Sequence, residues 1–308
     1  MKKNRIFIYL IALILVLLTT IVYQYKKEER LADMHQPPQW RKAAIAAQKQ
    51  NAKEKGYEID DFTRLISWPN KRQILCPHQT SDTLVGQSNI TNFHQEKYES
   101  QHGDKVVNFY DGKCYQAASP LIGGNGTTGE SLTLMSNLLM KTGKYDQIVI
   151  VPAAMGGTKA DLWAHGELAN KMLIKSLNDV GKTYQVTHVI WQQGEADLGA
   201  GTSRENYKSA FYSMLATIRN KQVMAPVFVS IGTRCSFDEK INVKDNLIAE
   251  ALKSLPNISE GIWLGVDTDE LIDENDRYDR CHFNKSGQEK FATAYAKVIQ
   301  VHKGQRYH

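Results

Sequence analysis

Residues 148–158 read IVIVPAAMGGT, a short apolar run that ends in a glycine-containing turn. From about residue 73 onward, similar runs alternate with longer amphipathic stretches. The runs are Thr83–Val85, Ile148–Val151, Val189–Trp191, Val227–Ile231 and Ile262–Val266. Short apolar strands that alternate with helices predict a mainly parallel sheet covered on both faces. We therefore expect an α/β fold, a three-layer α/β/α sandwich with a mainly parallel five-stranded sheet.

Five amphipathic stretches are predicted to form the main helices of this fold. They are Leu132–Lys141, Leu168–Val180, Tyr207–Asn220, Leu247–Leu255 and Lys285–Val301. In sheets of this kind, ligands bind beyond the carboxyl ends of the strands. The polar and glycine-rich motifs of this sequence follow those ends, so we expect the functional site there.

The amino-terminal segment differs from the rest of the chain. Residues 6–23 carry no charge and are almost wholly apolar. As a helix they would span roughly 27 Å, which is enough for a bilayer core. No small-x-small cleavage site follows them, which favours a retained signal anchor over a cleaved signal peptide or a buried helix. Basic residues flank the run on both sides and give a slight preference for a cytoplasmic amino terminus.

The sequence predicts three regions: a signal anchor with flanking basic residues over 1–30, a polar stalk or linker over 31–70, and a folded domain over 71–308. The Pro37-Pro38 pair would break a helix that continues from the membrane. The formal net charge is +5, and residues 1–30 hold six basic and two acidic side chains, so the remainder is nearly neutral. Nucleic-acid binding needs a clustered basic face, so we expect no nucleic-acid partner.

The chain has four cysteines, Cys76, Cys114, Cys235 and Cys281. None forms a Cys-x-x-Cys pair and no histidine cluster has metal-ligand spacing, so we expect no metal site. An even number of cysteines behind a signal anchor fits disulfides in an oxidising compartment, which favours a domain outside the cytoplasm. Three pairings remain open at this point.

A candidate nucleophile follows the first predicted strand, in the segment Gly86-Gln87-Ser88-Asn89. A serine on a tight turn after a strand can expose its hydroxyl, and the next helix start can supply backbone N–H groups to an oxyanion. The alternative is an ordinary turn or helix-capping serine.

A candidate base lies near the carboxyl terminus, where residues 278–284 read YDRCHFN. Asp279 and His282 are three residues apart and fall on one side of a turn. The carboxylate can then accept a hydrogen bond from Nδ1 of the imidazole, which leaves Nε2 free to act as a base. The alternative is a capping aspartate and a loop histidine.

Three further motifs follow predicted strand ends or lie between strands: PLIGGNGTTG (120–129), GGT (156–158) and QQGEAD (192–197). The chain lacks the glycine-rich phosphate-binding patterns of nucleotide sites, so we expect no nucleotide. Glu195 and Asp197 resemble a pair of glycosidase acids, but at this spacing a structural hydrogen-bond hub is the favoured interpretation. Trp163 and Trp191 could stack on sugars, but we favour a position for both in the hydrophobic core.

Taken in order, these segments resemble the SGNH-hydrolase superfamily and, within it, the sialate O-acetylesterase-like (carbohydrate esterase) domain. The resemblance covers roughly residues 73–303 and implies a flavodoxin-like sheet and a serine esterase that needs no cofactor. It implies Ser88 as nucleophile, His282 as base and Asp279 as the residue that orients it. The implied oxyanion hole consists of the backbone N–H groups of Ser88 and a loop glycine, Gly126 in preference to Gly124, and the Gln193 amide. The implied supporting residues are Gln87, Asn89, Gly157 and Glu195.

The expected substrate is an O-acetylated carbohydrate. The protein is also expected to bind the membrane through residues 6–23. The resemblance favours the disulfides Cys76–Cys114 and Cys235–Cys281 over buried free thiols, and the shared rim of the strand ends also favours the second pair. Two other functions remain open: a carbohydrate O-acetyltransferase that uses the same acyl-enzyme, and a non-catalytic carbohydrate-binding protein. The presence of all three triad residues argues against the latter.

Overall fold

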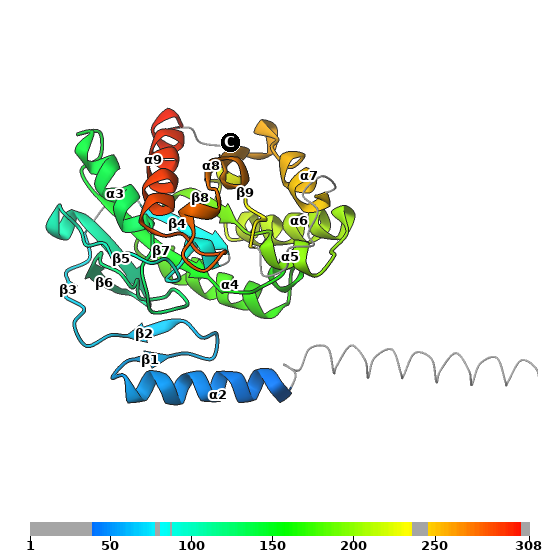
Figure 1. Ribbon diagram of the computed structural model, residues 1–308. Coiled ribbons are helices and arrows are strands. Elements are labelled where there is room, and N and C mark those ends of the chain that lie inside the picture. Colours follow the sequence, from blue (N-terminus) through cyan, green and yellow to red (C-terminus); the bar gives the residue numbers. More distant parts are fainter. Residues whose placement is uncertain (1–38, 78–80, 87, 236–245, 303–308) are drawn as a thin grey trace, which may run out of the picture. The chain divides into compact units, whose positions relative to one another are not determined.

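The computed structural model describes residues 39–77, 81–86, 88–235 and 246–302 (Figure 1). Two compact units divide the chain, Met1–Gln48 and Lys49–His308. Of the first unit, only the beginning of helix α2 (Gln39–Glu54) is described. The predicted signal anchor, residues 6–23, lies outside the described residues. Within the described parts, no helix is long and apolar enough to cross a membrane.

The main sheet has eight strands in the order β10-β9-β8-β4-β7-β5-β6-β3. All five strands predicted from the sequence are present. They are β4 (Ser81–Gly86), β7 (Ile148–Ala154), β8 (Val186–Gln192), β9 (Val227–Ile231) and β10 (Ile262–Asp267). These strands and β5 (Val106–Tyr110) run parallel, while β6 (Lys113–Gln116) is antiparallel to β5 and to β3 (Gln73–Ile74).

The prediction of five strands was wrong because it missed β3, β5 and β6. The buried Asn108 interrupts the apolar run of β5, and its side chain bonds both the N–H and the carbonyl of Ile122 at 2.7 and 2.9 Å. Asp111 and Gly112 join β5 to β6 with φ angles of 49° and 73°. Asp-Gly is a strong signal for a two-residue hairpin, and it was the signal available in the sequence.

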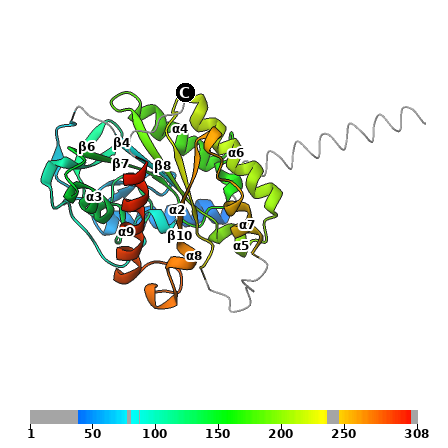
Figure 2. The ribbon, with the colours of Figure 1, turned by 90° about the horizontal axis from the view of Figure 1, so that it is seen from above.

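Helices cover both faces of the sheet, as the alternation of strands and helices predicts. One face carries α4 (Leu168–Val180), α6 (Arg204–Asn220) and α7 (Leu247–Lys253), and the other carries α3 (Leu132–Lys141) and α9 (Lys285–Val301) (Figure 2). Successive residues of β7 enter opposite cores: Val149 and Val151 join one, Ile148 and Ile150 the other. Burial on both faces explains why this strand is continuously apolar.

The strand register brings the sequence motifs to one edge. Gly86 at the end of β4 pairs with Ala154 of β7 and with Gln192 of β8, so the three strands end at one level. The chain leaves β4 toward β5 and β7 on one side and toward β8, β9 and β10 on the other. The carboxyl end of β4 is therefore a topological switch point, where open α/β sheets bind their ligands.

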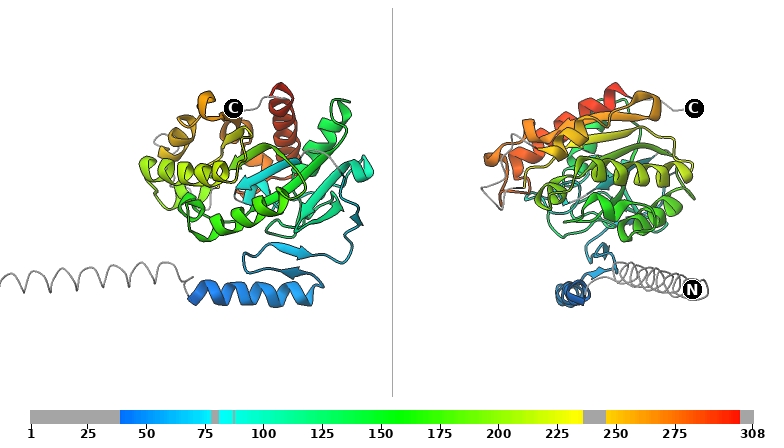
Figure 3. Two further views of the ribbon diagram at one scale, coloured as in Figure 1. Left: turned by 180° about the vertical axis from the view of Figure 1, so that it is seen from behind. Right: turned by 90° about the vertical axis from the view of Figure 1, so that its right-hand side faces the viewer.

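A small hairpin, β1 (Glu58–Ile59) and β2 (Leu65–Ser67), precedes the main sheet and lies outside it (Figure 3). Leu65 exchanges two backbone hydrogen bonds with the glycine-rich loop, to the carbonyl of Gly124 at 2.8 Å and from the N–H of Gly123 at 2.7 Å. Residues 49–70, which we expected in a stalk, thus belong by their contacts to the same compact unit as the sheet.

Candidate active site

Asp279 and His282 form the pair that their spacing predicts. Nδ1 of His282 lies 2.7 Å from Oδ2 of Asp279, and the backbone N–H of His282 donates to Oδ1 at 2.7 Å. The turn between them places Arg280 at φ +66°, a conformation that L-residues seldom adopt. Partial burial opposes ionisation of Asp279, but the hydrogen bonds from His282 outweigh it and hold the pKa of the carboxyl below its ordinary value. The carboxylate therefore orients the imidazole and leaves Nε2 for a proton.

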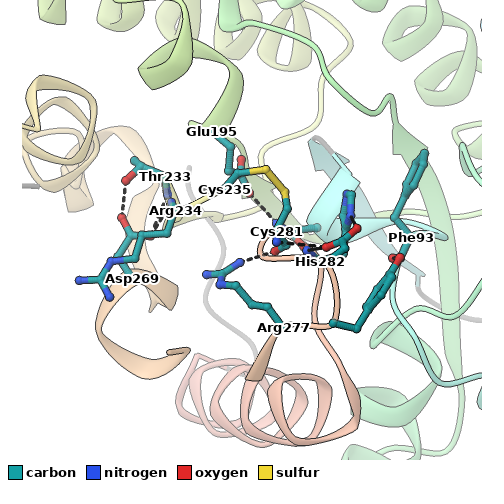
Figure 4. The surroundings of a disulfide bond; sticks show 12 residues. Phe93, Glu195, Thr233, Arg234, Cys235, Asp269, Arg277, Cys281 and His282 are labelled. Atoms are coloured by element: carbon teal, nitrogen blue, oxygen red, sulfur yellow. Dashed lines mark hydrogen bonds and ion pairs between the residues drawn. A yellow bond between two sulfur atoms is a disulfide. The ribbon is translucent and has the colours of Figure 1, made fainter. Parts of the chain in front are cut away.

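Two aromatic rings stack against the His282 imidazole. The Phe93 ring stacks on it at 5.3 Å between centroids and an interplanar angle of 19° (Figure 4). The Tyr278 ring stacks on it at 6.2 Å and 29°. The His282 side chain is 15% exposed, so it remains accessible from solvent. The sequence offered no signal for Phe93, which lies far from His282 along the chain and in no motif.

A buried serine–histidine pair, separate from the predicted triad, lies near this site. Oγ of Ser131 is 2.9 Å from Nδ1 of His94, whose ring stacks on Phe283 at 4.7 Å. Both side chains are buried. Burial, aided by the neighbouring His282, lowers the pKa of His94 to about 3. This pair is a neutral part of the core, and His282 is the histidine that faces solvent.

The predicted nucleophile lies at the switch point. Ser88 is the first residue of the 3₁₀ helix η1 (Ser88–Ile90), two residues beyond the end of β4. Gln87 lies outside the described residues. Ser88 thus follows the central strand at the edge that the register defines, and its role as nucleophile stays a prediction.

Two of the predicted supporting residues contact each other. Nδ2 of Asn89 donates to Oε1 of Glu195 at 2.8 Å, which ties the residue after Ser88 to the start of α5 (Glu195–Gly199). Glu195 is only 6% exposed, and burial raises the pKa of its carboxyl to about 7, against the opposing effect of the Asn89 hydrogen bond. Glu195 is therefore close to the balance between its acid and its carboxylate at neutral pH.

The side chain of Gln193 is fully buried next to the loop that carries Gly157 and Thr158. Its Nε2 lies 3.0 Å from the carbonyl oxygen of Thr158 and 2.5 Å from Oδ2 of Asp197. Both amide hydrogens thus have acceptors within the protein, and one of these bonds must open before Gln193 donates to an oxyanion. Its place in the oxyanion hole stays a prediction.

Glu195 and Asp197 bind different partners. Glu195 accepts from Asn89, whereas Asp197 accepts from Gln193 and, at 2.7 Å, from the backbone N–H of Ala160. The two carboxyl groups do not form a joint acid pair. They serve as a structural hydrogen-bond hub, which is the interpretation that their spacing favours. Trp163 and Trp191 are wholly buried and pack edge to face at 5.6 Å, so they belong to the core and not to a sugar-stacking surface.

The glycine-rich loop contacts the turn that follows Ser88. Gly126 has φ +88°, and a Cβ added there would lie 2.3 Å from the carbonyl oxygen of Asn92. A Cβ at Gly124 would lie 2.4 Å from Oγ1 of Thr91. Close approach of the backbone therefore requires glycine at both positions. The preference for Gly126 as the oxyanion donor stays a prediction.

Both predicted disulfides are present, Cys76–Cys114 and Cys235–Cys281. Cys281 lies between Asp279 and His282, and Arg277 donates to its carbonyl oxygen (Figure 4). On the other side of the bond, Asp269 of α8 (Thr268–Leu271) accepts from the backbone N–H groups of Thr233 and Arg234 at 2.9 and 3.0 Å. The second disulfide thus joins the His282 turn to an anchored loop after β9.

No group of three or more His, Cys, Asp or Glu side chains is placed to hold a metal ion within the described residues. Residues 83–300 match the family model described as "Carbohydrate esterase, sialic acid-specific acetylesterase". No curated protein matches the chain significantly.

Several solved structures are similar to this chain. A protein from Arabidopsis thaliana has a TM-score of 0.59 at 18% identity, covering 73% of this chain and 99% of its own. The structure titled NanS has a TM-score of 0.49 at 15% identity, covering 74% and 98%. A family 3 carbohydrate esterase from Clostridium thermocellum has a TM-score of 0.47 at 14% identity, covering 72% and 96%. At such identities the Arabidopsis structure supports the fold alone.

Proposed function

Because this chain belongs to the carbohydrate esterase, sialic acid-specific acetylesterase family, we propose that it removes O-acetyl groups from a carbohydrate through an acetyl-serine intermediate. The observation that carries this proposal is the hydrogen bond of 2.7 Å between Nδ1 of His282 and Asp279. It leaves Nε2 as the basic atom of an accessible imidazole at a site where the family supplies a serine nucleophile.

The proposed mechanism assigns each predicted residue one step. His282 takes the proton of the Ser88 hydroxyl as Ser88 attacks the acetyl carbonyl. The oxyanion accepts hydrogen bonds from the backbone N–H groups of Ser88 and Gly126 and from the Gln193 amide. The sugar alcohol leaves with the proton held by His282, and acetyl-Ser88 forms. His282 then activates a water molecule, which releases acetate and restores the serine.

The test is acetate release by the purified full chain from O-acetylated sialic acids, acetylated xylan, pectin and bacterial polysaccharides. Ser88→Ala should lower the rate by about 10⁴–10⁶, the usual cost of removing a triad member. Ser259→Ala is the matched control, because Ser259 is an exposed serine in a 3₁₀ helix at the amino end of β10, away from the carboxyl edge of the sheet. If Ser88→Ala kept more than about a tenth of the wild-type rate, the nucleophile would be another residue.

The same panel separates hydrolysis from transfer. An acetyltransferase would release little acetate alone and would acetylate an added sugar acceptor. A carbohydrate-binding protein without activity would do neither.

The proposal includes a location outside the cytoplasm, with residues 6–23 as the membrane anchor. The two disulfides support it, since such bonds persist in oxidising compartments. Alkaline phosphatase fused after residue 71 should be active, because it needs export to fold. Activity of a cytoplasmic reporter at the same position would reverse the orientation.

A further inference from the structure

The side chain of Asn125 joins the amino-terminal hairpin to the active-site loops. Its Nδ2 donates to the carbonyl oxygen of Thr63 at 2.7 Å and to the Thr63 hydroxyl at 2.6 Å. Its Oδ1 accepts from the backbone N–H of Gly156 at 3.2 Å. Asn125 is 9% exposed, so these bonds are made largely away from water. This amide therefore bonds the hairpin turn through its Nδ2 and the glycine turn after β7 through its Oδ1.

The turn that presents Thr63 is built around Asp60 and Arg64. Oδ1 of Asp60 accepts from the backbone N–H groups of Phe62 and Arg64, each at 2.9 Å, and Nε of Arg64 donates to Oδ2 at 2.8 Å. Arg64 is 1% exposed, and its guanidinium lies 5.1 Å from the centroid of the Tyr110 ring. An ion pair between the buried Arg64 and the partly exposed Asp60, together with several hydrogen bonds, thus fixes a turn of five residues.

The backbone of Thr63 has an unfavourable conformation. Its φ is +62°, in the left-handed region that a β-branched side chain rarely adopts. Such residues persist where the surrounding structure determines them, and they gather at functional sites. Here the conformation brings both the carbonyl and the hydroxyl of Thr63 to Asn125.

Asn125 in turn contacts the segment that follows Ser88. The backbone carbonyl oxygen of Asn125 accepts a hydrogen bond from the backbone N–H of Asn92 at 3.1 Å and another from Oγ1 of Thr91 at 3.0 Å. The next residue is Gly126, the predicted oxyanion donor. A shift of Asn125 would therefore move Gly126 relative to the nucleophile turn.

We propose that Thr63 is a positioning residue of the esterase, which acts through Asn125 to hold the Gly126 N–H in the oxyanion hole. The hairpin precedes the region matched by the family, residues 83–300, and completes its site. This inference rests on the proposed function. Thr63 does not touch the substrate, so its loss should weaken binding of the transition state and leave ground-state binding unchanged.

The test compares Thr63→Gly with Thr63→Ser in the full chain, with 4-nitrophenyl acetate as substrate. Thr63→Gly removes the hydroxyl and tolerates the positive φ, so kcat should fall by about 10-fold, less than the loss of an oxyanion donor itself. KM should change less than about twofold and Tm should not fall. Thr63→Ser restores the hydroxyl and should restore kcat.

Gln222→Gly is the matched control, because Gln222 also has a positive φ, 60°, in a turn after α6. It should leave kcat unchanged. In an Asn125→Ala background, Thr63→Gly should lower kcat no further, since both changes break one connection. The inference would be overturned if kcat of Thr63→Gly stayed within twofold of wild type. It would also be overturned if Thr63→Gly and Thr63→Ser lost kcat to the same extent and lost Tm to the same extent.

A fluorophosphonate that labels active serines separates this inference from the proposed function. A wild-type chain that neither turns over esters nor labels at Ser88 would refute the proposed function, and the inference with it. A wild-type chain that labels at Ser88, while Thr63→Gly labels at the same rate, would refute the inference alone. The expected result is slower labelling of Thr63→Gly and a normal rate for Thr63→Ser.

Discussion

The hydroxyl of Tyr278 donates a hydrogen bond of 2.8 Å to the carbonyl oxygen of Phe93, and both rings stack on His282. One bond beside the imidazole thus connects two segments that are far apart in the sequence. The orientation of His282 in the ring plane is set by Asp279, and its orientation out of that plane is limited by these two rings.

Tyr278→Phe should lower kcat without unfolding the protein. The variant keeps the stacked ring and loses only the hydrogen bond to Phe93, worth about 1 kcal/mol, so we expect a loss of about fivefold at most. Steady-state kinetics with 4-nitrophenyl acetate measures it. Tyr212→Phe, on a partly exposed tyrosine of α6, is the control. Equal kcat values in the two variants would show that the bond does not position His282.

Gln193→Ala should lower kcat by roughly 10²–10³ and change KM little, because an oxyanion donor acts in the transition state. The change also removes the donor to the carbonyl oxygen of Thr158 and one of the two donors to the buried Asp197, and leaving a buried acceptor without its donor costs about 1–3 kcal/mol of stability. Kinetics and urea unfolding therefore measure two separate losses. A raised KM with normal kcat would instead place Gln193 in substrate binding.

Glu195 should make the stability of the protein depend on pH. Its pKa is raised in the folded state to about 7, from 4.5. The folded state therefore binds this proton more tightly, and the resulting stability is full below pH 4.5 and is lost as the pH rises through 7. The loss amounts to as much as about 3 kcal/mol.

Glu195→Gln keeps an acceptor for Asn89 and cannot ionise. Relative to wild type, its free energy of unfolding should therefore increase between pH 5 and pH 8. Urea unfolding at both pH values gives the comparison. An equal difference at the two pH values would mean that Glu195 does not titrate in this range.

The two disulfides should differ in their effect on catalysis. Replacing Cys235 and Cys281 together by serine should lower kcat as well as stability, the latter by about 2–5 kcal/mol. The cause is that Cys281 precedes His282, and a displacement of about 1 Å can cost on the order of 10²-fold in rate. The same double replacement at Cys76 and Cys114 should lower stability and leave kcat close to wild type. Similar kcat values in the two double variants would contradict this assignment.

The sequence predicted the elements whose patterns are local. The strands around the site are buried on both faces and hence continuously apolar, and their alternation with helices determined the layers. Asp279 and His282 were predictable because three residues in a turn bring them together. The Cys235–Cys281 disulfide was predictable in part because loops at the carboxyl edge of a parallel sheet share one rim, whereas the Cys76–Cys114 disulfide was expected from the family resemblance.

The remaining features depend on contacts between distant segments. Phe93 reaches His282, and Thr63 reaches Asn125, only because the sheet and hairpin fold them together, and neither residue lies in a motif. The β5–β6 hairpin was missed although Asp111-Gly112 indicated it, because the buried Asn108 broke the apolar run. The polar composition of residues 49–70 predicts a stalk, but Arg64 of this segment is buried by an ion pair and two aromatic rings.

The disulfide between Cys76 and Cys114 decides where the gene can be shortened for protein production. A version trimmed to the family-matched residues 83–300 would retain Cys114, which is fully buried, and would lack its partner. It would carry an odd thiol during oxidative refolding, able to compete for Cys235 or Cys281 and to link two chains. It would also lack Leu65 and its two hydrogen bonds to the glycine-rich loop. Expression should therefore begin before Lys49, where the compact unit starts.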